Sequence, residues 1–248
     1  MKTALFADVH SNLEALQACL AHAGRSGAEE FVFLGDLVGY GADPEACIER
    51  VAKLVRQRVA VAVLGNHDAA VMSGWCGGMN INAREAVYWT RARLSPEQVG
   101  FLESLPLSVR AGECLYVHAS PHEPHDWNYI TESDAAAEGF AASDARLIFV
   151  GHVHHQNLFH SVSHGASRPF RPVPGEPIPL AAPRRWLAIA GSVGQQRDGS
   201  VAAAYALFDR ASATLTFHRV PYDHAAASAK RRAAGLDTHW DALAGIGI

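Results

Sequence analysis

Short apolar runs alternate with amphipathic, helix-like stretches through the first part of the chain. The apolar runs cover residues 3–7, 31–34 and 59–64, and leucines spaced three and four apart follow the first run. This spacing places the leucines on one helix face, and Ser11 with Glu14 predicts a capping box at the helix start. Because short links join the expected strands and helices, the pattern favours right-handed βαβ units and predicts a parallel sheet.

The middle of the chain is predicted to be mainly helical. Asp43 and Pro44 predict the cap and the first position of a second long helix. Further helices are predicted from Asn82 through Arg93, and from Ser95 onward. The remaining elements of this part are a hairpin over residues 107–117 and a short helix over residues 131–142.

Beyond residue 147 the pattern changes to consecutive strands. An Ala-rich helix is expected over residues 223–236, and the Pro-, Gly- and Arg-rich stretch 164–185 is interpreted as a long loop or arm. No internal repeat or linker is evident, so residues 1–248 are predicted to form one α/β sandwich domain whose second sheet is mixed or antiparallel. The expected strands cover residues 147–150, 156–161, 186–190, 202–209 and 214–220.

Composition and charge narrow the function classes. The chain has 49% hydrophobic and 19% charged residues with a net charge of -4, so it lacks the basic surface that general nucleic-acid binding requires. No apolar run approaches the roughly 18 residues of a membrane helix. A cleaved signal peptide would remove Asp8, so the expected location is the cytoplasm. The four cysteines lie far apart and are expected to be free thiols.

Five apolar runs end in residue types that bind metal ions. In open α/β sheets, sites form beyond the carboxyl ends of the strands, so these residues are predicted to converge. Carboxylate, amide and imidazole side chains are ligands for divalent cations, and one carboxylate can bridge two of them. The closures are Asp8-Val9-His10, Gly35-Asp36, Gly65-Asn66-His67-Asp68, His118 and Gly151-His152-Val153-His154.

These closures resemble the five motifs of the calcineurin-like metallophosphoesterase family. They occur in the family's order over residues 3–155, with Asp36 extended as Gly35-Asp36-Leu37-Val38-Gly39-Tyr40-Gly41. The resemblance implies a four-layer αββα sandwich with two mixed β-sheets. It also implies a dinuclear metal centre, with a bridging hydroxide as nucleophile, that hydrolyses phosphate esters.

The family's functional residues carry over position by position. Two divalent ions are implied, chosen from Mn, Fe, Zn and Ni, with Mn favoured. His67 would be the proton donor to the leaving group, and Asp68 would orient it. Asp36 would bridge the ions. The first ion would be held by Asp8, His10, Asp36 and His154, and the second by Asp36, Asn66, His118 and His152.

A later segment resembles one branch of the family. Residues 191–199 read Gly-Ser-Val-Gly-Gln-Gln-Arg-Asp-Gly, similar to a small bacterial phosphodiesterase-like subgroup in which Pro usually stands at the position of Gln196. Arg197 follows a Gly-rich turn after a predicted strand and is a candidate for binding the substrate phosphate. Trp127 and Tyr129 have two interpretations, stacking on a nucleobase or anchoring their loop, and we favour anchoring.

The motif set predicts a phosphodiesterase or phosphatase acting on a small phosphate ester or nucleotide. One alternative is a dinucleoside polyphosphate hydrolase, which nothing in the residues separates from general phosphodiesterase activity. The other is a non-catalytic metal-binding scaffold, disfavoured because His67 and all seven ligand positions are intact. Substrate, metal identity and oligomeric state stay open.

Overall fold

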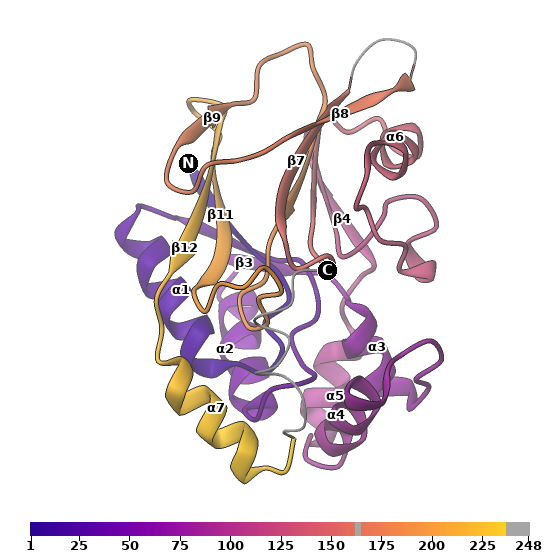
Figure 1. The fold of residues 1–248 in the computed structure, drawn as a ribbon, viewed down its shortest axis with the longest axis vertical. Coiled ribbons are helices and arrows are strands. Elements are labelled where there is room, and N and C mark those ends of the chain that lie inside the picture. Colours follow the sequence, from indigo (N-terminus) through magenta and orange to yellow (C-terminus); the bar gives the residue numbers. More distant parts are fainter. Residues whose placement is uncertain (162–164, 237–248) are drawn as a thin grey trace.

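Two β-sheets packed face to face, with helices on both outer faces, form the four layers of the molecule (Figure 1). The computed structural model describes residues 1–161 and 165–236. The α/β sandwich expected from the sequence is confirmed, and both sheets are mixed.

The first sheet carries the alternating βαβ part of the chain. Its first three strands are parallel, as predicted, and β11 and then β12 continue it in antiparallel fashion. Within the described residues this sheet has the order β3-β2-β1-β11-β12-β9. The strands are β1 (Lys2–Phe6), β2 (Glu30–Phe33), β3 (Ala60–Ala62), β9 (Pro177–Pro179), β11 (Ala203–Asp209) and β12 (Thr214–Val220).

The second sheet combines the predicted hairpin with later strands. Strands β5, β6 and β10 are parallel neighbours, and the flanking strands are antiparallel. Its order over the described residues is β4-β5-β6-β10-β7-β8. The strands are β4 (Ser108–Ala111), β5 (Cys114–Val117), β6 (Leu147–Val150), β7 (Gln156–Ser161), β8 (Ser167–Phe170) and β10 (Trp186–Ala190).

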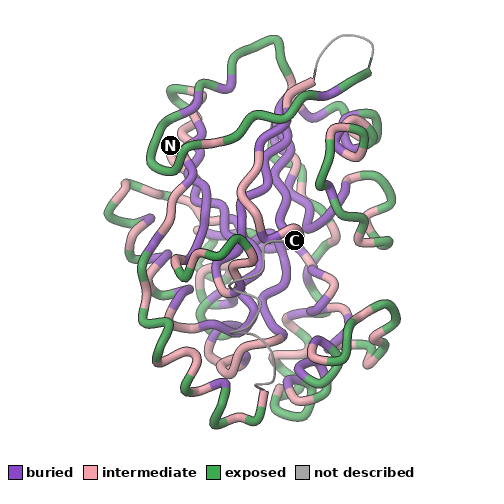
Figure 2. Tube along the Cα trace, in the orientation of Figure 1, coloured by how far each residue is buried: buried purple, intermediate pink, exposed green. Residues whose placement is uncertain are grey.

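Apolar side chains fill both the space between the sheets and the space under the helices. Along β1, Leu5 faces the inter-sheet layer and Phe6 faces α1, because successive strand residues point to opposite faces. Figure 2 shows the buried strands in the middle of the molecule and exposed loops around them. The helices are α1 (Leu13–Arg25), α2 (Pro44–Arg56), α3 (Asn66–Ser73), α4 (Ile81–Arg91), α5 (Pro96–Glu103), α6 (Ser133–Ala141) and α7 (His224–Ala233), with a 3₁₀ turn at Pro124–Asp126.

The stretch 164–185, predicted as a loop or arm, contains two edge strands instead. β8 pairs with β7, and β9 pairs with β12. Both strands contain proline, which lacks an N–H and is tolerated in a sheet at an edge. The prediction was wrong because pairing depends on distant partners that local composition does not reveal. His164 lies outside the described residues.

Two helix starts differ from the sequence prediction. Asn12 caps α1, its Oδ1 accepting from the Ala15 N–H, because Ser11 has a left-handed backbone. Asn80 caps α4 in place of Asn82. The predicted helix start at Ser95 is confirmed, and Ser95 forms a capping box with Gln98.

Two smaller expectations can be compared with the structure. The four cysteines are free thiols, as expected. Across the part of the chain that is described, no helix has the length and apolar character needed to cross a membrane.

Candidate metal centre

The five strand closures meet at one edge of the sandwich. The loops after β1 and β2 and the start of α3 come from the first sheet, and the loops after β5 and β6 come from the second. The side chains form three overlapping groups whose potential ligand atoms lie within 4.8 Å of one another. These groups are Asp8 with His10 and His154, then His10 with Asp36 and His67, and finally Asp36 with His118 and His152.

The first group surrounds a point where two imidazole nitrogens face each other. His10 Nε2 lies 3.3 Å from His154 Nε2, and His154 Nε2 lies 3.6 Å from Asp8 Oδ1. Both carboxylate oxygens of Asp8 also accept from the backbone N–H of His152, at 3.2 and 3.0 Å. The loop after β6 therefore fixes the carboxylate that follows β1.

The group of Asp36, His118 and His152 is joined to the first group through Asp36. Its Oδ2 lies 3.7 Å from His10 Nε2 and 3.4 Å from His118 Nε2. His118 Nε2 in turn lies 3.2 Å from His152 Nδ1 and 3.1 Å from Asn66 Oδ1. The other oxygen of Asp36 accepts from the His67 N–H at 2.8 Å, in the first turn of α3.

Backbone carbonyls fix the orientation of three imidazoles. His10 Nδ1 meets the Val38 carbonyl at 3.1 Å, His118 Nδ1 meets that of Leu34 at 2.6 Å, and His154 Nδ1 meets that of Gln195 at 2.6 Å. A carbonyl only accepts, so in the neutral ring each Nδ1 carries the proton and donates. The Nε2 lone pair is then left to face the centre, the usual outer-shell arrangement of a metal-binding histidine.

Burial and mutual charge shift the pKa values of these side chains. For Asp36, burial raises the pKa, but the charges of His118 and His67 outweigh this effect and the pKa is lowered. For His118, burial lowers the pKa, but the charge of Asp36 prevails and raises it to about 9. Burial raises the pKa of Asp8 to about 8. Burial is also the main cause of the lowered pKa values of His10, His67, His152 and His154.

Residues at this edge have unusual backbone conformations. Non-glycine residues with positive φ are uncommon, and each costs about 1–3 kcal/mol unless its surroundings impose it. Five candidate ligands have such values: Asp8 (54°), His10 (47°), Asp36 (52°), His152 (66°) and His154 (68°).

The structure corrects the predicted partner of Asp68. Its carboxylate accepts from the backbone N–H groups of Val38 and Gly65, at 3.1 and 3.0 Å. His67 Nδ1 is buried without a hydrogen-bond partner, close to Gly39. Asp68 therefore joins the loop after β2 to the start of α3, and its carboxylate makes no hydrogen bond to His67 Nδ1.

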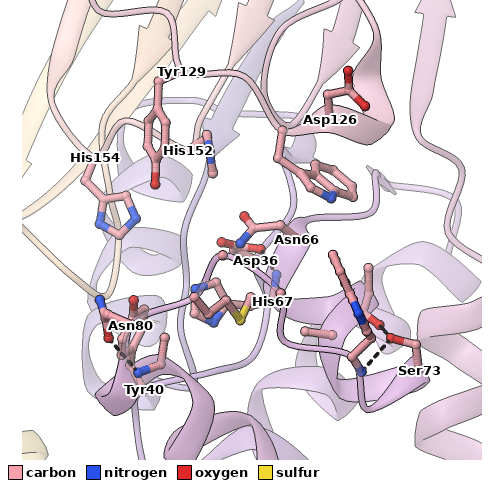
Figure 3. A pocket seen from close by; sticks show the side chains of 18 of the residues that line it. Asp36, Tyr40, Asn66, His67, Ser73, Asn80, Asp126, Tyr129, His152 and His154 are labelled. Atoms are coloured by element: carbon pink, nitrogen blue, oxygen red, sulfur yellow. Dashed lines mark hydrogen bonds between the residues drawn. The ribbon is translucent and has the colours of Figure 1, made fainter.

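A cleft of about 300 Å³ opens above the cluster. Figure 3 shows Asp36, Asn66, His67, His152 and His154 around it. Arg197, the sequence candidate for phosphate binding, also lines this cleft, and its Nη2 donates to Gln195 Oε1 at 2.9 Å.

The segment 192–195 hydrogen-bonds to two candidate ligands, a role that its sequence did not reveal. The Ser192 hydroxyl and the Gly194 N–H both donate to the Asp8 carbonyl at 2.9 Å, and the Gln195 carbonyl holds His154. This C-terminal segment thus fixes candidate ligands from both sheets.

The cleft residues to which the sequence analysis gave no role include Tyr40, Trp75 and Asn80. Tyr40 packs against the rings of His10 and His67, with centroids 4.9 and 4.6 Å apart, and hydrogen-bonds to Asn80. Trp75 lies in the run Gly74-Trp75-Cys76-Gly77-Gly78, and a large apolar residue among glycines is the one signal that the sequence offers for it.

The donor set fits divalent cations. His10 Nε2 and His154 Nε2 lie 3.3 Å apart. In the tautomers that the carbonyls favour, neither nitrogen carries a proton, so the two cannot hydrogen-bond to each other. A cation between them would replace this repulsion with coordination by nitrogen and carboxylate ligands. The shared Asp36 extends the same chemistry to the group that contains His118 and His152.

Comparisons with known proteins agree on the family. The sequence model of the calcineurin-like phosphoesterases matches residues 1–156. A relative from Methanocaldococcus jannaschii, named "Uncharacterized protein MJ0912", is 35% identical over 229 residues, covering 89% of this chain and 87% of that protein.

Solved structures extend the match to the whole chain. A metallophosphoesterase from Sphaerobacter thermophilus is 38% identical with a TM-score of 0.86, covering 100% of this chain and 99% of that one. Hypothetical protein PH1004 from Pyrococcus horikoshii OT3 shares the fold, with 17% identity, a TM-score of 0.78 and coverage of 100% and 98%. The chain belongs to the metal-dependent calcineurin-like phosphoesterase family and is a hydrolase acting on phosphoric ester bonds.

Proposed function

We propose that the protein is a dinuclear metallophosphoesterase that hydrolyses small phosphodiesters or phosphomonoesters. The position of Asp36 carries this proposal, because one carboxylate lies between His10 and His118, which belong to two different donor groups. The proposal treats residues 1–248 as one domain, since the loops of both sheets supply candidate ligands.

The proposed ligands divide as the family resemblance implies. Asp8, His10 and His154 hold one cation, and His118, His152 and Asn66 hold the other, with Asp36 shared. Bound there, the cations supply a water of lowered pKa and neutralise charge on the phosphoryl oxygens.

The protein's own groups then orient the ester and move a proton. Arg197 is placed to bind a phosphoryl oxygen from the cleft wall. His67 Nδ1 is buried against Gly39, which leaves Nε2 as the ring nitrogen facing the cleft. His67 is the proposed donor of the proton that the leaving alkoxide requires.

The test is Mn²⁺-dependent hydrolysis of bis(p-nitrophenyl) phosphate beside p-nitrophenyl phosphate, with and without EDTA. His67→Ala is expected to lower kcat by roughly 10²–10⁴-fold while the metal content measured by elemental analysis stays unchanged. His122→Ala, in an exposed loop position outside the cleft lining, is the matched control. Repeating the assay after loading with Fe, Zn or Ni identifies the preferred ion.

Two results would overturn the proposal. Turnover that survives EDTA would exclude metal-dependent hydrolysis, and wild-type turnover by His67→Ala would exclude its role as proton donor. The ratio of diester to monoester rates assigns the substrate class.

A further inference from the structure

The cleft extends well past the candidate ligands. Its volume of about 300 Å³ is typical of a small-molecule site, so a phosphoryl group bound at the cluster would fill only its floor. Two loops form its outer part: residues 74–80 between α3 and α4, and residues 123–129 after β5. In Figure 3, Asp126 and Tyr129 lie on one side of the cleft and Ser73 on the opposite side, with Asn66 between them.

Trp75 lies on the first of these loops and is 73% exposed. Its indole packs against its own loop, because a Cβ added at Gly77 would lie 2.2 Å from Trp75 Cζ2. The backbone N–H of Trp75 donates to Ser73 Oγ at 3.1 Å. At the end of α3, Arg91 Nη1 donates to the Val71 carbonyl at 2.9 Å. An exposed indole is thus held at the cleft without being part of the core.

Trp127 lies on the second loop, which contacts the metal-centre residues. Its backbone is left-handed, with φ of 54°, and its ring meets His118 edge-on at 5.9 Å. Tyr129, two residues on, stacks on His152 with centroids 4.0 Å apart. These contacts anchor the loop, and the half-buried Trp127 still lines the cleft.

The charges of the outer cleft indicate which kind of ligand group can bind there. Among the described residues that line the cleft, Arg197 is the only lysine or arginine. The outer loops instead contribute Trp75, Met79, Trp127 and the carboxylate of Asp126. A second phosphate would meet no cation there, whereas an uncharged flat ring would cover apolar surface and stack on indole.

We propose that this outer cleft binds a planar aromatic ring carried by the alcohol part of the phosphate ester. The ring packs against Trp75 and Trp127 while the phosphate lies at the metal centre, which makes Trp75 a determinant of specificity. The placement of the phosphate rests on the function proposed above. A nucleobase and a simple aryl ring share the required chemistry.

The test compares AMP with ribose 5-phosphate, which release the same ribose oxygen and differ only in the base. If the enzyme prefers diesters, their methyl esters replace them. The wild type is expected to have the lower KM for AMP. Trp75→Ala is expected to raise that KM about tenfold, with kcat and the ribose 5-phosphate constants unchanged.

Two further variants isolate the indole. Gly77→Ala keeps Trp75 but displaces its ring, and is expected to raise the KM for AMP in the same way. Tyr88→Ala removes an exposed aromatic ring of α4 that does not line the cleft, and is expected to change nothing. Repeating the assays with phenyl phosphate identifies the kind of ring that binds. If Trp75→Ala raises the KM for phenyl phosphate as well as for AMP, the cleft accepts any flat ring. If it raises the KM for AMP alone, the cleft is specific for a nucleoside.

Binding of adenosine to EDTA-treated protein, measured by calorimetry, separates this proposal from the proposed function. Trp75→Ala should weaken that binding about tenfold even if no ester is hydrolysed. Equal KM values for AMP and ribose 5-phosphate in the wild type, or unchanged values for both AMP and phenyl phosphate in Trp75→Ala, would overturn the proposal.

Discussion

The inter-sheet layer and the edge that carries the candidate ligands differ in almost every physical respect. The layer is built from apolar side chains such as Leu5, Phe149 and Phe208, and none of its described buried residues has a positive φ. The edge, a few residues further along the same strands, buries carboxylates and imidazoles on left-handed backbone. Asp8, for example, lies two residues beyond the end of β1.

This difference separates stability from function within single strands. Burying apolar area stabilises the fold by about 25 cal/mol per Å², whereas unpaired buried charge and backbone strain cost free energy. The edge therefore persists because the layer beside it stabilises the fold. Substitutions in the layer should lower stability and leave turnover unchanged, while substitutions at the edge should lower turnover and leave stability nearly unchanged.

The largest expected effect comes from Asp36→Asn. A neutral amide removes the carboxylate that the His10 group shares with the His118 group, so metal content and turnover should fall to background. The variant keeps the shape of the side chain, so the stability of EDTA-treated protein should stay within about 2 kcal/mol of wild type. Elemental analysis and urea unfolding measure the two quantities. Two tightly bound ions in the variant would contradict the shared-ligand assignment.

Phe149→Ala tests the opposite side of the comparison. Phe149 is 1% exposed and packs between Tyr116 and Phe208 in the inter-sheet layer. Its truncation should lower the free energy of unfolding by about 3–5 kcal/mol through lost contacts and a cavity. Turnover per folded molecule, measured well below the unfolding midpoint, should match the wild type. A fall in kcat at full metal occupancy would show that the two regions are coupled.

Gly39→Ala tests how closely the edge is fitted around His67. Gly39 has φ of 95°, and an added Cβ would lie 2.6 Å from His67 Nδ1. The methyl group should displace the ring and lower kcat by about 10²-fold, the cost of misplacing a reacting group by about 1 Å. Metal content should be unchanged, because His67 is not a proposed ligand. An unaltered kcat would mean that the ring position has little influence on turnover.

The smallest effect is expected at the opposite edge, where Arg146 Nη2 and Nε donate to Glu113 at 3.0 and 2.5 Å. The hydrogen bond from Arg146 lowers the pKa of Glu113 below its ordinary 4.5. Its stabilisation is therefore complete above that value and is lost as pH falls through the folded-state pKa. Since the Glu113 side chain is 40% exposed, Glu113→Gln should cost less than about 1 kcal/mol at pH 7.

Chemical denaturation of Glu113→Gln at several pH values tests this sign. The difference from wild type should shrink as the pH falls below 4.5. A difference that grows in acid would mean that the carboxylate does not stabilise the fold through Arg146.

The sequence predicted the cluster of candidate ligands because each member lies within four residues of the end of an apolar run, and the strand ends of a sheet converge. Asp68 lies in the same motif, but its carboxylate accepts from the backbone N–H of Gly65 in that motif and of Val38 in the loop after β2, which side-chain types do not encode. Trp75 has no periodic or motif context, so its place at the cleft depends on how α3 and α4 pack. The strands β8 and β9 were missed because their pairing partners lie elsewhere in the chain.

The interleaving of late strands has a consequence for synthesis on the ribosome. All candidate ligands have been made by residue 154, yet β1 pairs with β11 and β6 pairs with β10, strands that follow more than 30 residues later. Until residues 186–209 emerge, β1 and β6 each have an unpaired edge, and unpaired strand edges expose a nascent chain to aggregation. A ribosome-bound chain stalled near residue 160 would thus possess every candidate ligand and still lack the frame that brings them together.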